Sequence, residues 1–311
     1  MAAHNISGVR GKHDQRVLDW RIWIEWVEPL ANGAGALWLN EVERAWAEAQ
    51  TDEESWVAEQ RRVDDWQTPW WERVPEGWQM LSDHYRIARS LTQAQFEYLR
   101  ALPLVLHLPA QHSFLVHAGL LPYDPTHSRA SEEQPLAHQP VSYGSSPAHA
   151  GNLRPRTAVT QRTAQELSIL SDVPQNTDPW TVLNMRNVLR SQRITPKTHW
   201  GTAWAELWNS MMSECRGLDY VGDDGFPCEP TTIVFGHAAA RGLDVKRWTV
   251  GLDSGCAYGR RLSALVLGGE GAGAGRTIPF GDRGRARIVD VKCHERLMLQ
   301  QDGASDDFFV L

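Results

Sequence analysis

The segment of residues 233–259 reads IVFGHAAARGLDVKRWTVGLDSGCAYG, which is the pattern of two buried strands separated by turns. Its two short apolar runs, Ile233–Phe235 and Trp248–Leu252, are typical of strands in a buried sheet. The first run ends in Gly236-His237, so an imidazole stands at a strand end. Because α/β proteins commonly assemble sites from loops at the rim of a sheet, His237 is a candidate functional residue.

Two other histidines stand in similar places. His117 follows the apolar run Phe114–Val116, and His13 lies in the string GVRGKHD at residues 8–14. Each histidine taken alone is explained better by a hydrogen-bonded structural role. Three such histidines in one chain favour a shared functional site.

The rest of the chain predicts an α/β fold, and its length suits one large domain or two small ones. Helices are predicted over Asp14–Leu30, Glu41–Trp66, Thr92–Leu102 and Trp204–Met212, and further strands over Leu104–Leu108, Leu262–Leu267 and Ile288–Val291. The segment from about residue 35 to about residue 90 is predicted to be a helical insertion packed by tryptophan rings. Residues of about 126–156 are rich in Pro, Ser and His, which predicts a disordered surface loop.

The composition excludes some classes of partner. The net charge is −7 and no basic cluster is present, so nucleic acid is not an expected partner. No run approaches the roughly 20 apolar residues of a membrane helix, and the N-terminal residues lack a signal core. As written, the sequence predicts a cytoplasmic protein, or a vacuolar one if an N-terminal segment is missing.

The cysteines give no sign of a metal cluster. Cys215, Cys228, Cys256 and Cys293 stand singly, without a CxxC pair. Neither a zinc cluster nor a dense disulfide framework is indicated, and we expect reduced thiols.

The histidine strings, in their order along the chain, resemble the motifs of the calcineurin-like metallophosphoesterases. The strings are GKHD at 11–14, VHAG at 116–119, GH at 236–237 and LDSGCAYG at 252–259. This family includes phosphoprotein phosphatases and diadenosine-tetraphosphate hydrolases. The match is closer still to fungal members, some of which are zinc-dependent endopolyphosphatases.

The resemblance implies a fold and a chemistry. The fold is a four-layer α/β/β/α sandwich, a β-sandwich flanked by helices, in a single domain over residues 1–311. Its site holds two divalent metal ions, manganese, zinc, iron or magnesium, which bind phosphate oxygens and activate a water. The implied reaction is hydrolysis of phosphate monoesters or phosphoanhydrides in a phosphoprotein, polyphosphate or dinucleoside polyphosphate.

The resemblance also implies roles for particular residues. His117 and His237 are expected to be ligands of the second ion, and His13 to be a general acid held by Asp14. Arg186, in the string NMRN at 184–187, is expected to bind a phosphate oxygen. A surface or interdomain ion pair explains Arg186 about as well.

Two departures from the family pattern predict impaired activity. The strings GDxHG and GDxxDRG, which supply further ligands ahead of GNHD, do not precede the GKHD string, so we expect an N-terminally truncated chain without the first strands. Lys12 stands where the family has a metal-binding Asn, and an ammonium repels a dication at close range. The alternative function is that of a non-enzymatic pseudophosphatase acting as an interaction or regulatory protein.

Overall fold

The computed structural model describes residues 6–49, 51–63, 66–140, 158–268, 275–282 and 284–294. The chain divides into two compact units, a helical unit up to Leu102 and a sheet unit from Pro103. The family resemblance implies one domain, but the apolar residues on the two sides of this boundary enter separate cores. Leu99 packs into the core of the helical unit, and Leu104 packs into that of the sheet unit.

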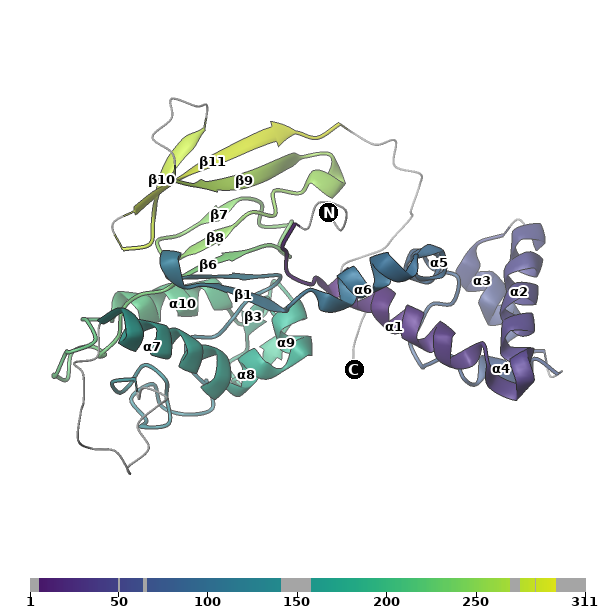
Figure 1. Ribbon diagram of the computed structural model, residues 1–311, viewed down its shortest axis with the longest axis horizontal. Coiled ribbons are helices and arrows are strands. Elements are labelled where there is room, and N and C mark those ends of the chain that lie inside the picture. Colours follow the sequence, from purple (N-terminus) through teal and green to yellow (C-terminus); the bar gives the residue numbers. More distant parts are fainter. Residues whose placement is uncertain are drawn as a thin grey trace. The chain divides into compact units, whose positions relative to one another are not determined.

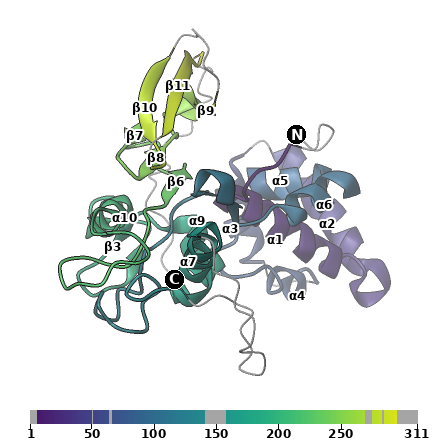
Figure 2. The same cartoon turned by 60° about the vertical axis from the view of Figure 1, so that its left-hand side comes forward.

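The helical unit consists, in its described part, of α-helices that follow one another along the chain. They are α1 (Lys12–Val27), α2 (Leu30–Ala49), α3 (Glu53–Gln60), α4 (Thr68–Trp71), α5 (Asp83–Ser90) and α6 (Gln93–Ala101). Helices α5 and α6 lie along α1 (Figures 1 and 2).

Local side-chain chemistry sets several of these helix ends. The predicted capping box at the start of α6 is present, with Thr92 and Gln95 bonded to each other's backbone N–H. The helix predicted over 41–66 is interrupted, because Asp52 caps a new helix by accepting from the Ser55 N–H at 2.8 Å. Within α2, residues 31–33 adopt left-handed backbone, which separates its first turn from the rest.

Tryptophan rings form the core of the helical unit. Trp38 is fully buried and contacts the rings of Trp70 and Trp71, while Trp20 contacts Trp23. Stacked and edge-to-face contacts of this kind add to the stabilisation from buried apolar area. The aromatic packing expected of this region is therefore observed, although it extends over α1 as well.

The sheet unit is built on a five-stranded mixed sheet with the order β1-β2-β6-β8-β7. These strands are β1 (Val105–Leu108), β2 (Ser113–Val116), β6 (Thr232–Phe235), β7 (Asp244–Val245) and β8 (Thr249–Gly251). Strands β2, β6 and β8 run parallel, and the outer strands β1 and β7 are antiparallel to their neighbours. The parallel strands bring the carboxyl ends of β2 and β6 to the same edge.

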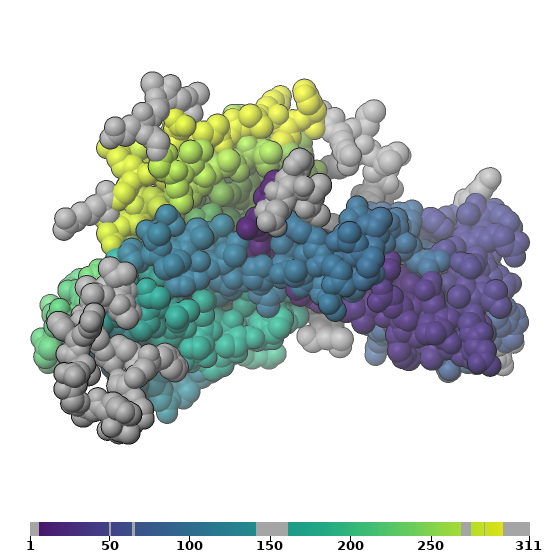
Figure 3. All heavy atoms as spheres, in the orientation of Figure 1, coloured from purple at the N-terminus to yellow at the C-terminus, as the bar shows by residue number. Residues whose placement is uncertain are grey.

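Alternate residues of the central strands pack into two different layers. Phe114 and Phe235 face a core with the helices, whereas Val234 faces a core with a second sheet. The helices are α7 (Ala158–Asp172), α8 (Pro174–Thr177), α9 (Pro179–Asn184) and α10 (Trp204–Ser213), and the second sheet has the order β10-β11-β9. Its strands are β9 (Arg261–Leu267), β10 (Arg276–Phe280) and β11 (Gly284–Lys292). The teal helices and the yellow strands β10 and β11 therefore lie on opposite sides of the central sheet (Figures 1 and 3).

A small ribbon completes the described part of the sheet unit. It has the order β4-β3-β5, from β3 (Asn187–Val188), β4 (Ile194–Thr195) and β5 (Thr202–Ala203). Two short 3-10 helices, η2 (Pro109–Gln111) and η4 (Cys256–Tyr258), lie in turns. The unit is thus mixed α/β, as expected, and the four-layer sandwich with absent first strands stays a prediction.

The expectation of reduced cysteines is wrong. Cys215 is disulfide-bonded to Cys228 and Cys256 to Cys293, with Cα atoms 4.8 and 5.5 Å apart. The partners are 13 and 37 residues apart in sequence, so the fold, rather than a local motif, brings them together.

The first part of the predicted disordered loop is packed. Leu136 is fully buried, and Gln134 is tied to the backbone of Asp124 through both ends of its amide. Residues 141–156 of that loop lie outside the described residues. No described helix is both long enough and apolar enough to span a bilayer.

Candidate functional site

His117 and His237 meet at one edge of the central sheet. His117 directly follows β2, and His237 follows β6 after Gly236, whose N–H donates to the His117 carbonyl at 2.9 Å. His117 Nε2 lies 3.2 Å from His237 Nδ1, and the ring centroids are 4.8 Å apart. The predicted convergence of these two side chains is therefore confirmed.

Backbone geometry fixes the position of both rings. His237 has a φ of 63°, in the left-handed region that non-glycine residues seldom adopt. After His117 the chain turns at Gly119, where a Cβ atom would lie 2.4 Å from the Trp204 ring. Glycine is required there, and it lets the turn press against the buried indole of α10.

The spacing of the two nitrogens is compatible with two ligands of one metal ion. Two nitrogen ligands of a tetrahedral ion, at bonds of about 2.0–2.1 Å, lie about 3.3 Å apart. A complete site needs more donors, and no group of three or more His, Cys, Asp or Glu side chains gathers within the described part of the chain. The pair therefore suits part of a metal site.

Arg186 lies beside this pair, between α9 and β3. Its Nε donates to the His237 carbonyl at 3.3 Å, and its Nη1 donates to the Pro196 carbonyl at 3.2 Å. These contacts hold the guanidinium against the backbone of the loop that carries His237. Among the described residues, the acceptors of Arg186 are carbonyl oxygens rather than the carboxylate of an ion pair.

Sequence reasoning missed Arg241 and Asn187. Arg241 Nη2 donates to Asn187 Oδ1 at 2.5 Å, and Asn187 is itself buried and donates to the carbonyls of Thr198 and Trp200. Burial lowers the pKa of Arg241, and the Arg186 cation lowers it further, while Asp244 and Glu206 act in the opposite direction. No motif marks this arginine, because its place depends on the fold of the turn after His237.

The other two predicted site residues, His13 and Asp14, lie at the start of α1 in the helical unit. The Asp14 carboxylate accepts from the Gly11 N–H at 2.8 Å, which satisfies the helix N-terminus. His13 Nδ1 lies 2.8 Å from His84 Nε2, and the two rings are stacked. The close partner of the His13 ring is thus His84, where the resemblance leads us to expect Asp14.

The surroundings of His13 favour its neutral form. Partial burial lowers the pKa of His13 to about 4, and the charges of Lys12, His84 and Arg16 add to this effect while Asp14 opposes it. The pKa of His84 is also lowered, first by burial and then by Arg16. At neutral pH both rings are therefore uncharged.

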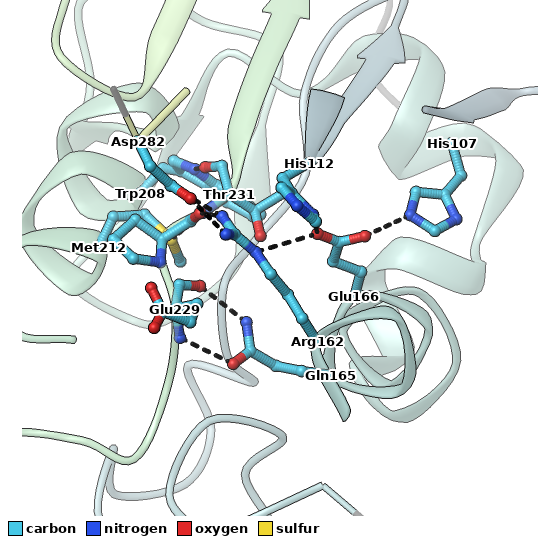
Figure 4. Close-up of polar contacts among 11 residues, drawn as sticks. His107, His112, Arg162, Gln165, Glu166, Trp208, Met212, Glu229, Thr231 and Asp282 are labelled. Atoms are coloured by element: carbon cyan, nitrogen blue, oxygen red, sulfur yellow. Dashed lines mark hydrogen bonds and ion pairs between the residues drawn. The ribbon is translucent and has the colours of Figure 1, made fainter. Parts of the chain in front are cut away.

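A second polar cluster of the sheet unit lies around the fully buried Glu166 of α7 (Figure 4). Its Oε2 lies 2.6 Å from His107 Nε2 of β1, and its Oε1 lies 2.9 Å from His112 Nδ1. Arg162 Nε is 3.6 Å from the same carboxylate, and the Arg162 guanidinium also forms an ion pair with Asp282. Its hydrogen bond with Arg162 is the main cause that lowers the pKa of Asp282. This cluster ties α7 to the central sheet and to the turn after β10.

Comparisons with known proteins give short matches. No family model matches the chain. A symmetrical bis(5'-nucleosyl)-tetraphosphatase of Paraburkholderia phymatum is 51% identical over 43 residues, which are 14% of this chain and 15% of that protein. Proteins of the same name in Burkholderia mallei and Burkholderia pseudomallei are 54% identical over 41 residues, 13% of this chain and 14% of theirs. The matches thus span about one seventh of the length of these curated relatives.

A solved structure is also similar. It is a crystal structure provisionally assigned as a diadenosine tetraphosphatase, with 22% identity, a TM-score of 0.34, and coverage of 68% of this chain and 61% of that one. The curated relatives matched over these short stretches are named as symmetrical bis(5'-nucleosyl)-tetraphosphatases. They give no support to the narrower resemblance to fungal endopolyphosphatases.

Proposed function

We propose that the sheet unit carries the site of a metal-dependent hydrolase that cleaves phosphoanhydride bonds in nucleotide polyphosphates. The observation that carries the proposal is the convergence of His117 and His237 at the ends of β2 and β6, with Arg186 held against the His237 backbone. Nucleotide polyphosphates are preferred to phosphoproteins and inorganic polyphosphate because the matched relatives are named as tetraphosphatases of dinucleosides. The layers on the two faces of the central sheet support the four-layer fold that the proposal includes.

The residues of the chain have distinct roles in this proposal. His117 and His237 would hold one divalent ion, which when bound would polarise phosphate oxygens and activate a water. Arg186 binds a phosphate oxygen of the substrate and orients it, because a guanidinium matches the geometry of a phosphate. The hydrolysis adds one water across a P–O–P bridge and releases two phosphate-ended products.

His13, with Asp14, is the proposed general acid. With a pKa of about 4 the imidazole is neutral at pH 7 and has no second proton to donate. The proposal therefore requires that His13 take up a second proton before it acts as an acid.

A second candidate function is phosphate binding without catalysis, in an interaction or regulatory protein. Two observations favour it. Lys12, the first residue of α1, stands where the resemblance predicts a metal-binding Asn. In addition, the described residues contain no cluster of three metal-ligating side chains.

Metal affinity and hydrolysis, measured on the same variants, test the proposal and separate the two candidates. We would titrate Mn²⁺ and Zn²⁺ into the chain by calorimetry and follow the release of nucleotides from diadenosine tetraphosphate. His117→Ala and His237→Asn should each weaken metal binding at least about 10-fold and abolish hydrolysis. His127→Ala, which removes a half-exposed histidine elsewhere in the sheet unit, is the matched control and should change neither.

Metal binding that is unchanged in His237→Asn would contradict the assignment of the pair. Nucleotide binding without turnover, by a chain that binds metal normally, would instead support the non-catalytic candidate.

A further inference from the structure

Two crossed hydrogen bonds lock the loop after His237 to the segment that carries Arg186. In one direction, Arg186 Nε donates to the His237 carbonyl. In the other, Arg241 Nη2 donates to Asn187 Oδ1. The loop itself is a tight turn, in which the Arg241 N–H donates to the Ala238 carbonyl at 2.8 Å. The two arginines are therefore positioned by each other's segments, next to the histidine pair.

Arg241 has a donor that the protein leaves unused. Its Nη1 is buried and has no hydrogen-bond partner among the described residues. A buried polar group without a partner costs free energy, and more so when it is charged. Such groups are rare in folded proteins, so an unused guanidinium nitrogen beside a candidate site points to a ligand.

The charges around Arg241 indicate the kind of ligand. The Arg186 cation acts unfavourably on the Arg241 cation, and the nearby Asp244 is itself paired with Lys246 Nζ at 2.5 Å. A polyanion that offers several oxygens would reduce the repulsion between two guanidinium groups held close together. A chain of two or more phosphates provides them on successive phosphorus atoms.

We infer that Arg241 is a second phosphate-binding residue of this site, one that selects ligands with at least two consecutive phosphates. The inference rests on the proposed function, since it assigns the first phosphate to Arg186 and the His117–His237 pair. Arg241 then binds the neighbouring phosphate through Nη1, while Nη2 remains on Asn187. A phosphate monoester would leave Arg241 without its ligand.

Calorimetry in the presence of EDTA tests this inference without any contribution from a metal. The probes are inorganic phosphate, pyrophosphate and tripolyphosphate. The unaltered chain should bind pyrophosphate about tenfold or more tightly than phosphate, because one charge-assisted hydrogen bond is worth about that factor. Arg241→Gln should remove this preference and leave the phosphate affinity within about twofold, whereas Arg186→Gln should weaken binding of all three probes.

Two further variants exclude the loss of any one arginine, and misfolding of the variant, as the cause of a lost preference for pyrophosphate. Arg216→Gln removes another arginine of the sheet unit, one that donates to the Ser213 carbonyl, and should keep the preference for pyrophosphate. Arg241→Lys keeps the cation without the two-pronged geometry, so it should fold even if Arg241→Gln does not, and should lose most of the preference.

The inference is overturned if Arg241→Gln or Arg241→Lys keeps the full preference, if they weaken phosphate and pyrophosphate equally, or if the unaltered chain binds none of the probes. Failure here is distinguishable from failure of the proposed function, which is decided by metal binding and hydrolysis in the His237→Asn variant.

Discussion

Strand β2 has a histidine pair at each end, and the two pairs differ in their surroundings. At its start, His112 joins His107 on the buried carboxylate of Glu166, with Arg162 and Asp282 close by. At its other end, His117 meets His237, and the segments around this pair carry the guanidiniums of Arg186 and Arg241. The first arrangement pairs opposite charges directly, and the second brings two arginines together.

The difference shows how residues of one type take on different roles. The His107–His112 pair lies where opposite charges are matched, which is how a fold uses buried polar groups for structure. The His117–His237 pair lies at the carboxyl ends of parallel strands, where α/β proteins bind ligands. Close to it in sequence is Arg241, whose Nη1 has no hydrogen-bond partner among the described residues. We therefore expect changes in the first cluster to alter stability and changes in the second to alter binding.

The largest effect is expected from Glu166→Gln. This change removes a fully buried carboxylate from three neighbours that can carry positive charge, so it should lower the free energy of unfolding of the sheet unit by about 3 kcal/mol or more. Urea denaturation measures it. Glu133→Gln, on an exposed side chain, is the control and should cost no more than about 0.5 kcal/mol. A loss below 1 kcal/mol for Glu166→Gln, roughly that of an exposed pair, would mean that the cluster is not a structural element.

A smaller loss of stability should follow from His107→Gln. It removes one of the two histidine contacts to Glu166 and leaves the other in place. Because hydrogen bonds to charged groups are worth about 1.5–3 kcal/mol, the free energy of unfolding should fall within that range. The pyrophosphate affinity should not change, and a parallel loss of affinity would show that the two ends of β2 are coupled.

The His13–His84 pair of the helical unit is a third histidine pair, and it should make the stability of that unit depend on pH. The pKa of His13 is about 4 in the folded chain and near 6.5 when unfolded, so between these values the unfolded state binds more protons. Stability of the helical unit should therefore fall as the pH falls from 6.5 to 4. The loss should be about 1 kcal/mol or less, because the ring is partly exposed and solvent screens the charges.

Proton NMR of the His13 ring measures this pKa directly. His84→Ala removes one of the groups that lower it, so the pKa should move toward 6.5. A His13 pKa that is already near 6.5 in the unaltered chain would contradict the expectation.

The smallest effect on stability is expected at the functional end of β2. His237→Asn places there a residue that tolerates left-handed backbone, so the free energy of unfolding should change by about 0.5 kcal/mol or less. The same variant should lose metal binding. A loss of several kcal/mol would instead place His237 with the structural histidines and erase the contrast between the two ends of β2.

The sequence was sufficient for the elements whose signals are local. Apolar runs that end in Gly236-His237 and at His117 predicted two strand ends, and the parallel pairing of β2 and β6 brought them together. The capping box of Thr92 and Gln95 predicted the start of α6. In each case the deciding residues lie within a few positions of one another.

What the sequence could not predict depends on residues that are distant along the chain. Glu166 lies 59 and 54 residues from His107 and His112, and the two disulfides join cysteines without any motif. Arg241 becomes a candidate ligand only through its hydrogen bond to Asn187, which lies 54 residues away. Such pairs arise from the packing of whole elements, for which spacing rules give no signal.

The tryptophan core of the helical unit has an optical consequence. Trp20 lies 4.7 Å from Trp78 and 5.3 Å from Trp23 between ring centroids, and Trp38 lies 5.3 Å from Trp71. At such separations the electronic transitions of neighbouring indoles couple, and the coupling produces a circular dichroism signal that isolated indoles lack. The buried indoles of the sheet unit, Trp204 and Trp208, instead contact phenylalanine rings. The melting of the helical unit can therefore be followed by its own spectroscopic signature, with no label attached to the chain.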